Sequence, residues 1–400
     1  MKRLLLLVSL GLFPTGTMIA QSPQFQYIIL IIQENRTPDN LFGAAGLPGV
    51  DAQINGTKSH GEPLSKGNDF NHTHGGYLAE INGKYPETSR NYVASGADPY
   101  WDLAAQYGFA NRMFQTNQGA SYPAHHFLVS GSSALSDDSD VLVFDEIGQS
   151  PKYGCGAPQG TVVPTIAPDG TIGSAYPCFD RSSLIDLLES ANLTWKYYAA
   201  PRQHIWNAPD SLSTHTTSPN IVLNPPQVLN DIADGTLANV SWVTPAKAYS
   251  DHPATSTGGG PAWVASIVNA VGQSPYWQNT AIIVTWDDWG GFYDHVPPLP
   301  NNTGWCTVYC YGFRVPLLVI SAYTPTGYVD NDVHDFGSIL HFVEDNFSLG
   351  LIGPGTWADS FADDLSGFFQ ASPRPREFHS VKSRKLTQAE LADTGEPDDY

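Results

Sequence analysis

Positively charged residues are scarce in this sequence. Its 400 residues include 19 Lys and Arg against 39 Asp and Glu, so the formal net charge is -20 at pH 7. Nucleic acids and anionic membranes are polyanions, and such a chain would repel both at long range. The negative net charge excludes nucleic acid as a standing partner and allows only transient contact with a membrane surface. Any phosphate group that the protein binds must be held by a local site.

Long apolar runs are also missing, except at the N-terminus. The chain opens "MKRLLLLVSLGLFPTGTMIA", with two basic residues, a short apolar stretch and small residues near Ala20. The stretch is too short to span a bilayer comfortably, and the arrangement is typical of a secretory signal peptide. We therefore expect residues 1–20 to be removed and the mature protein to be secreted or periplasmic.

Cysteine is rare as well, with four residues in the whole chain. An even number of cysteines in an exported protein predicts two disulfides, and the simplest of the possible pairings joins Cys155 with Cys178 and Cys306 with Cys310. Neither pair has the C-x-x-C spacing of a structural zinc site. The pentapeptide G-x-S-x-G is absent too, which argues against a serine hydrolase of the lipase or esterase type.

The pattern that is present alternates apolar strands with amphipathic helices. It predicts a mostly parallel sheet flanked by helices, in one domain over 21–370. The Gly-, Pro-, Ser- and Asn-rich regions 44–118 and 132–180 suggest long loops or insertions over one sheet edge, and 371–400 reads as a flexible tail. The expected strands lie at 26–35, 239–246, 280–288 and 314–323, the expected helices at 262–271 and 335–347, and a helix leading into a strand at 180–200.

Acidic and amide side chains follow two of the apolar strands. Glu34 and Asn35 come after the first strand, and Asp287 and Asp288 come after the 280–288 run. In open α/β sheets, ligands bind beyond the carboxyl ends of the strands. Four oxygen-bearing side chains at one edge suit a divalent cation. The alternative is that Glu34 pairs with Arg36 and that Asp288 caps a turn.

A candidate nucleophile lies in "TNQGASYPAHHFLVSG", residues 116–131. Ser121 follows the small residues Gly119 and Ala120, and Pro123 favours the first turn of a helix, so Ser121 is predicted at a helix N-terminus. Backbone N–H groups and the helix dipole there favour a serine alkoxide or a bound phosphate. The alternative is a plain helix-capping serine.

Several histidines lie on polar loops, where they could contact a phosphoryl group or exchange protons with a leaving oxygen. A single loop histidine is more commonly solvated or simply hydrogen-bonded. The candidates are His72, His204, His252 and His295.

Five landmarks together resemble a known family. "IIQENRTPDNLFG", "GASYPAHHFLVSG", "SDHP", "WDDWGGFYDHVPP" and "GFRVPLLVISAY" with its following "DFGSILHFVEDNF" are similar, in this order, to those of the secreted bacterial phosphoesterases. That family includes phospholipases C and related acid phosphatases, and its fold is similar to that of alkaline phosphatases. The resemblance covers roughly residues 26 to 350 and implies a metal-assisted phosphoester hydrolase.

The resemblance also implies roles for individual residues. Ser121 is the nucleophile and touches the metal, and His72 and His252, with His204 and His295 less closely matched, contact the phosphate or the leaving group. Thr37, Pro38 and Asn40 depart from the motif of many phospholipases C, which leaves lipid specificity open. The implied metal residues are Glu34, Asn35, Ser121, Asp287 and Asp288.

The expected cofactor is a divalent metal ion, with calcium and zinc as the first candidates. The expected substrate is a phosphate ester, either a phospholipid head group or a small phosphomonoester. The rival reading is a secreted protein without catalytic activity that binds calcium or carbohydrate.

Overall fold

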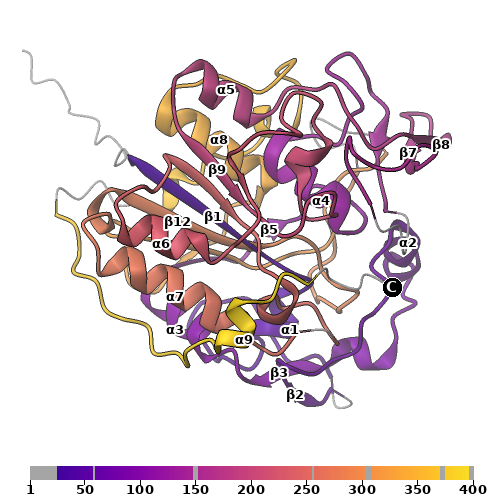
Figure 1. Ribbon diagram of the computed structural model, residues 1–400. Coiled ribbons are helices and arrows are strands. Elements are labelled where there is room, and N and C mark those ends of the chain that lie inside the picture. The colour runs from indigo at the N-terminus through magenta and orange to yellow at the C-terminus, as the bar shows by residue number, and fades with distance from the viewer. Residues whose placement is uncertain are drawn as a thin grey trace, which may run out of the picture.

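An eight-stranded sheet forms the centre of the protein in the computed structural model (Figure 1). The structure describes residues 25–56, 59–146, 152–254, 256–301, 308–369 and 374–395, so the predicted signal peptide lies outside the described residues. In order across the sheet, the strands are β10 (Ile221–Val222), β9 (Trp195–Tyr198), β11 (Val240–Val243), β1 (Tyr27–Gln33), β12 (Thr280–Trp286), β13 (Leu317–Ser321), β4 (Gly108–Ala110) and β14 (Tyr328–Asp330).

Most neighbouring strands of this sheet run parallel. β1 pairs in parallel with β11 on one side and with β12 on the other. β13 is antiparallel to both of its neighbours, β12 and β4. The predicted mostly parallel sheet is confirmed. The buried strand β12 consists largely of β-branched and apolar residues, as expected for a strand covered on both faces.

Helices cover both faces of the sheet (Figure 1). The longer helices, such as α7 and α8, bury apolar side chains, and all ten residues of α4 are buried. Among the described residues, no helix combines the length and the apolar character of a membrane span. One face carries α4 (Ser121–Ser130), α5 (Leu184–Ser190) and α8 (Phe336–Phe347), and the other carries α3 (Asp98–Gln106), α6 (Gln227–Ala233) and α7 (Gly260–Gly272).

The regions 44–118 and 132–180 are not loops throughout, which corrects part of the expectation for them. They contain strand β4 of the central sheet and several short elements, because a Gly- and Pro-rich composition does not reveal strands of two to four residues. The remaining elements are α1 (Pro38–Phe42), β2 (Gly61–Pro63), α2 (His74–Ile81), β3 (Tyr92–Ser95), β5 (Met113–Phe114), β6 (Leu142–Val143), β7 (Val163–Ile166), β8 (Ile172–Ala175), β15 (His334–Asp335), α9 (Gln388–Leu391) and the 3-10 turns at Glu87–Arg90, Ala208–Ser211, Lys247–Tyr249, Trp277–Asn279, Ala358–Ser360 and Ser366–Phe368.

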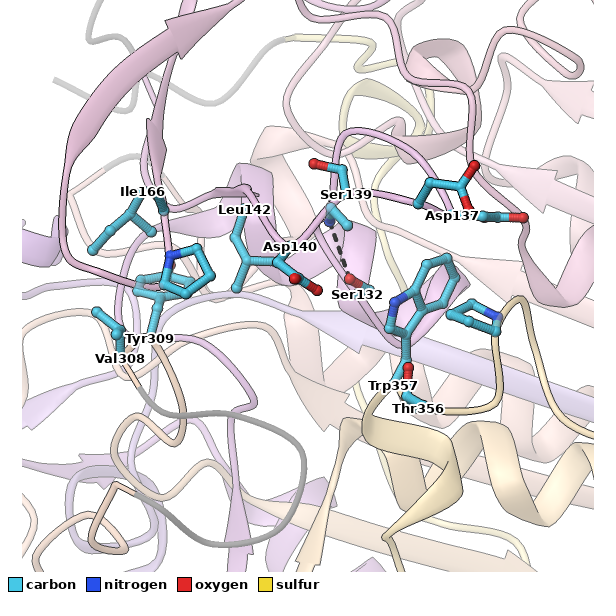
Figure 2. Close-up of a pocket in the computed structure, with 15 residues that line it drawn as sticks. Ser132, Asp137, Ser139, Asp140, Leu142, Ile166, Val308, Tyr309, Thr356 and Trp357 are labelled. Atoms are coloured by element: carbon cyan, nitrogen blue, oxygen red, sulfur yellow. Dashed lines mark hydrogen bonds between the residues drawn. The ribbon is translucent and has the colours of Figure 1, made fainter.

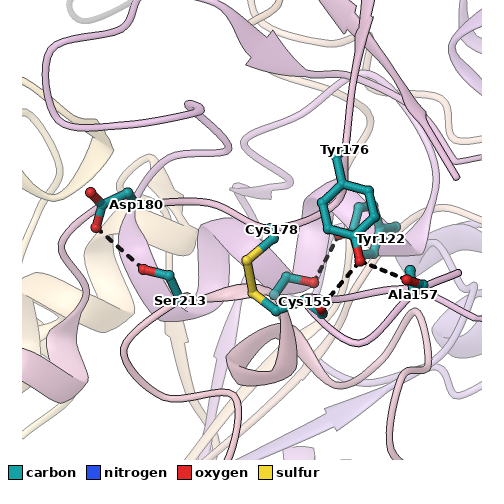
Figure 3. The surroundings of a disulfide bond; sticks show 8 residues. Tyr122, Cys155, Ala157, Tyr176, Cys178, Asp180 and Ser213 are labelled. Atoms are coloured by element: carbon teal, nitrogen blue, oxygen red, sulfur yellow. Dashed lines mark hydrogen bonds between the residues drawn. A yellow bond between two sulfur atoms is a disulfide. The ribbon is translucent and has the colours of Figure 1, made fainter. Parts of the chain in front are cut away.

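One predicted disulfide joins Cys155 to Cys178 and closes a loop with a sequence separation of 23 residues (Figure 3). The hydroxyl oxygen of Tyr176 lies 3.1 and 2.6 Å from the carbonyl oxygens of Cys155 and Ala157, so its single hydrogen can be donated to either and fastens the same loop. The second predicted pair includes Cys306, which lies outside the described residues.

Residues 374–395, expected to belong to a flexible tail, make specific contacts with the rest of the chain. The Arg376 guanidinium donates to the Gln106 carbonyl at 2.6 Å, and the side chain of Val381 is buried. Glu390 in α9 accepts from Thr257 Oγ1 at 2.7 Å. These contacts depend on a few well-placed side chains within a polar segment, so average composition does not reveal them.

Candidate active site

The carboxyl ends of β1 and β12 lie side by side and bring four predicted residues together. The two strands are parallel, with Gln33 opposite Trp286, so the residues that follow them meet at one edge of the sheet. The Asn35 N–H donates to Asp287 Oδ1 at 3.2 Å. The Arg36 N–H donates to the Asp288 carbonyl at 3.1 Å. The predicted convergence of the two motifs at this edge is therefore observed.

The turn after β1 has an uncommon backbone conformation. Asn35 has φ of 59°, in the left-handed region that asparagine tolerates better than most residues. Gly290 packs against it, and a Cβ at Gly290 would come within 2.6 Å of the Asn35 carbonyl oxygen. Backbone strain of this kind persists only where surrounding structure enforces it, and it clusters at functional sites. Here it orients the Asn35 side chain beside the carboxylates.

Ser121 enters this group from helix α4. It is the first residue of the helix, and Ala120 occupies the N-cap position without a side-chain hydrogen bond, so Ser121 is not a plain capping serine. Its Oγ lies 3.3 Å from Glu34 Oε2 and 3.2 Å from Asp288 Oδ2. A hydroxyl has one hydrogen and donates to one of these carboxylates at a time.

The carboxylates of this group are buried together. Glu34, Asp287, Asp288 and Ser121 are all 0% exposed. Burial raises the pKa of the Asp287 carboxyl, because a charged carboxylate loses its hydration there. Arg36 lies close in sequence, but its guanidinium donates to the Asp251 carbonyl at 3.0 and 2.7 Å. The Arg36 guanidinium thus binds the Asp251 carbonyl instead of forming the alternative pair with Glu34.

His125 belongs to the same group, although the sequence analysis did not single it out. Its Nε2 lies 3.4 Å from Glu34 Oε1 and 3.8 Å from Asp287 Oδ2, and its ring is 0% exposed. It stands one helical turn after Ser121, at i+4, so the two side chains share a face of α4. The spacing of Ser121 and His125 was the signal available in the sequence. His125 lies within the apolar run "AHHFLVS", however, and therefore resembles a core histidine.

The donor set of this site fits a divalent cation. Asn35 Oδ1 and Asp287 Oδ2 are buried and have no hydrogen-bond partner among the described residues. Glu34, His125 and Asp287 each offer a ligand atom, and these atoms lie within 4.8 Å of one another. Buried oxygens without partners and unbalanced buried carboxylates are costly unless a cation neutralises them. The residues present can therefore hold a divalent metal ion.

His72 and His252 lie next to this group. The Asn35 amide nitrogen is 3.3 Å from His72 Nε2, and the rings of His72 and His252 are 6.0 Å apart. In each histidine Nδ1 faces a backbone carbonyl, that of Phe70 at 2.7 Å or that of Pro253 at 2.9 Å. Nδ1 therefore donates in both rings, so Nε2 carries the lone pair when the ring is neutral. His72 Nε2 faces the Asn35 amide, whereas His252 Nε2 can exchange protons or contact a phosphoryl oxygen.

His204 and His295 occupy other surroundings. His295 Nδ1 is 2.9 Å from both carboxylate oxygens of Asp39, and its Nε2 is 3.1 Å from Asp51 Oδ1. His204 Nδ1 accepts from the Trp206 N–H at 3.3 Å, and the two rings are in edge contact. These contacts give His295 and His204 structural partners, so the described contacts do not join either residue to Ser121.

A cavity of about 460 Å³ lies apart from these side chains (Figure 2). Asp137 and Asp140 line one side, and Trp357 and Tyr309 form part of the wall. Asp137 accepts hydrogen bonds from Ser182 N–H and Oγ at 2.7 and 2.6 Å. None of the residues of the Ser121 group lines this cavity.

Two phospholipases C are similar to most of this chain. The hemolytic phospholipase C of Pseudomonas aeruginosa is 24% identical over 408 residues, which cover 86% of this chain and 56% of that protein. Phospholipase C B of Mycobacterium tuberculosis is 25% identical over 424 residues, which cover 88% of this chain and 79% of that protein. This chain thus spans about half the length of the Pseudomonas protein.

Solved structures show a weaker likeness. A protein of the alkaline phosphatase superfamily from Vibrio parahaemolyticus has a TM-score of 0.41 and 11% identity, covering 87% of this chain and 71% of that one. A score of this size carries no conclusion of its own. The model of the phosphoesterase family, in contrast, matches residues 25–350 and includes every residue of the site described above. The chain belongs to the phosphoesterase family.

Proposed function

We propose that this protein is a divalent-metal-dependent hydrolase of phosphoric esters, of the phospholipase C or acid phosphatase type, and that it works through a phosphoserine at Ser121. The observation that carries the proposal is the position of Ser121 Oγ. It stands at the first residue of α4, within 3.3 Å of two buried carboxylates that follow parallel strands. Family membership and the similarity to phospholipases C support the reaction class.

Glu34, Asn35, Ser121, Asp287 and Asp288 would hold the metal. A divalent cation bound there supplies positive charge that favours ionised Ser121 and offsets the negative charge of the phosphoryl oxygens. The buried oxygens of Asn35 and Asp287 that lack hydrogen-bond partners support this assignment.

Ser121 would begin the reaction. Its hydroxyl proton passes to the accepting carboxylate, Glu34 or Asp288, as Oγ forms a bond to phosphorus. The bond between phosphorus and the leaving alcohol breaks at the same time. The N–H groups of the first turn of α4 and its dipole favour the negative charge of the phosphoryl group.

His252 would complete the first step and His72 would support it. We assign His252 in its imidazolium form as the acid: Nδ1–H donates to the Pro253 carbonyl, and the proton on Nε2 passes to the leaving alcohol oxygen, which leaves a neutral imidazole. His72 Nε2 faces the Asn35 amide and holds that side chain in place. In the second step water attacks the phosphorus of the phosphoserine and gives a proton to the neutral imidazole of His252. The bond between phosphorus and Ser121 Oγ breaks, the protonated carboxyl returns its proton to Oγ, and phosphate or a phosphomonoester is released.

The chain would act outside the cytoplasm after loss of residues 1–20. N-terminal sequencing of the mature protein should begin near Gln21, and material that begins at Met1 would contradict export by cleavage. Two predicted residues drop out of the proposed machinery, since His204 and His295 contact other partners.

One set of assays tests the proposal. Metal content is measured on the purified protein, and hydrolysis is followed with p-nitrophenyl phosphate, a phosphodiester and phosphatidylcholine. We expect turnover of at least one class, loss of turnover with a chelator and recovery with a divalent metal. A fully metal-loaded protein that hydrolyses none of the three would favour the binding-protein reading.

A further inference from the structure

We infer that His125 is a nitrogen ligand of the metal and that the site therefore takes a transition-type divalent cation, such as zinc or iron, rather than calcium. The inference deepens the proposed function and rests on the same metal site. It starts from the hydrogen bonds of His125, which decide which of its two nitrogens carries a proton.

Tyr197 lies beside the His125 imidazole, on the side of Nδ1. The Tyr197 hydroxyl donates to the Trp206 carbonyl at 2.8 Å. The Tyr197 side chain is 0% exposed, and a phenolate without hydration is costly, so this side chain is a neutral phenol. A phenol has a single hydrogen, and here that hydrogen is already committed to Trp206. Towards any other group, the Tyr197 oxygen can only accept.

The contact with Tyr197 determines which nitrogen of the neutral His125 imidazole carries the hydrogen. Its Nδ1 lies 3.2 Å from the Tyr197 oxygen. Because that oxygen accepts, the hydrogen of this contact belongs to Nδ1. In a neutral imidazole, Nε2 then carries the lone pair. A hydrogen bond from the far nitrogen to a fixed partner is the usual way in which a metal-binding histidine is oriented.

The lone pair of His125 Nε2 faces two carboxylate oxygens. It points at Glu34 Oε1, 3.4 Å away, and at Asp287 Oδ2, 3.8 Å away. Asp287 Oδ2 has no hydrogen-bond partner among the described residues. A lone pair facing two buried carboxylate oxygens is unfavourable unless a proton or a metal ion lies between them, and a bound metal ion would take the place of that proton. The three atoms offer nitrogen and oxygen ligands of the kind that bind one metal ion.

The identity of the metal follows from the ligand type. Calcium and magnesium are bound by oxygen ligands, whereas imidazole nitrogen suits zinc, copper, iron and nickel. An oxygen-only set of Glu34, Asn35, Asp287 and Asp288 leaves this choice open. The addition of His125 favours the transition-type cation.

The test uses the whole metal-loaded protein with three variants. Zinc and cobalt are bound one at a time, affinities are measured by competition with a chromophoric chelator, and the cobalt form is examined by visible absorption and X-ray absorption. Calcium affinity is measured in parallel. The variants are His125→Gln, Tyr197→Phe and the control His126→Gln, whose native side chain contacts Arg181 instead.

We expect His125→Gln to weaken zinc and cobalt binding about a hundredfold and to change the cobalt absorption, with a much smaller effect on calcium. Tyr197→Phe keeps the imidazole but removes the acceptor of Nδ1–H, so zinc affinity should fall about tenfold. His126→Gln should leave both values unchanged. Should His125→Gln fail to fold, Tyr197→Phe tests the same contact in a protein that keeps the ligand.

Unchanged zinc affinity and cobalt spectra in both His125→Gln and Tyr197→Phe would overturn the inference, and His125 would then be a counter-charge for the carboxylates. None of these readouts requires turnover. A protein that binds cobalt through His125 and hydrolyses no phosphoester supports the inference and contradicts the proposed function. An active metalloenzyme whose cobalt absorption is the same in the wild type and in His125→Gln supports the proposed function and contradicts the inference.

Discussion

Ser121 Oγ lies 3.2 Å from Asp288 Oδ2, although 167 positions separate the two residues in the chain. The contact joins the start of helix α4 to the end of strand β12. Only the fold brings these side chains together, and both are fully buried. A hydroxyl held against a carboxylate in a dry site has a proton acceptor in place before any substrate arrives.

The carboxylates should cost stability in the metal-free protein and contribute to it once metal is bound. Asp287→Asn removes one buried negative charge, so the metal-free variant should melt at a higher temperature than the metal-free wild type. Its metal affinity should fall at least about a hundredfold, which removes about 2.7 kcal/mol of metal-dependent stabilisation at high metal concentration. Thermal unfolding with and without zinc measures both effects.

The control for this prediction is Asp138→Asn, which removes a carboxylate from an exposed position. Asp138→Asn should leave the melting temperature nearly unchanged, both with and without zinc. If Asp287→Asn keeps the full metal-dependent rise in melting temperature, the assignment of Asp287 to the metal site is wrong.

Glu80 should make the protein less stable as the pH rises. Burial raises the pKa of Glu80 from 4.5 to about 8, while Trp289 Nε1 donates to its carboxyl at 2.6 Å. Between these values the folded state holds a proton that the unfolded state has lost, so this group lowers the free energy of unfolding by up to about 1.4 kcal/mol per pH unit. Glu80→Gln keeps an acceptor for Trp289 and should remove that slope.

Denaturant titrations at several pH values between 5 and 8 check the Glu80 prediction. The variant and the wild type should differ least at the acid end of this range and most at the alkaline end. A constant difference between the two proteins across the range would mean that Glu80 does not titrate there.

The disulfide between Cys155 and Cys178 should stabilise the fold without taking part in the chemistry. It closes a loop with a separation of 23 residues, and a loop of that length corresponds to about 3 kcal/mol of stabilisation in the chain-entropy model. Replacing both cysteines by serine should lower the free energy of unfolding by about that amount and leave metal affinity unchanged. Calorimetry and metal titration of the double variant check this, and altered metal affinity would show that the loop positions the site.

Strands with a strong apolar run were predictable from the sequence. β1 and β12 lie within the predicted ranges 26–35 and 280–288, and the polar residues after them meet because parallel neighbours end at one edge. The antiparallel direction of β13 was not predictable, because a buried strand has the same apolar pattern in either direction. The three-residue strand β4 carries too few residues to show a pattern.

The candidate site was predictable where residues follow a strand and not where they lie within a helix. Glu34 and Asp287 stand at the ends of apolar runs, where a polar side chain attracts notice. His125 lies in a helix whose ten residues are all buried, so its surroundings in the sequence resemble a core. His295 stands near Asp288 in sequence, but its contacts with Asp39 and Asp51 show how weakly sequence proximity predicts a shared site.

The central claim is that Ser121 attacks phosphorus. Ser121→Ala should keep the fold and lower the rate by a factor on the order of a thousand or more, because the two-step route loses its nucleophile. Ser130→Ala removes a buried hydroxyl from the other end of the same helix and serves as the control, with near-normal turnover expected.

The most direct measurement is to quench the wild-type enzyme with acid during turnover of a labelled phosphate ester and to sequence the labelled peptide. The mechanism predicts phosphoserine at Ser121, in the peptide that contains "GASYPAHH". A fully active enzyme that yields no labelled peptide, together with near-normal turnover by Ser121→Ala, would contradict the mechanism and assign the attack to water.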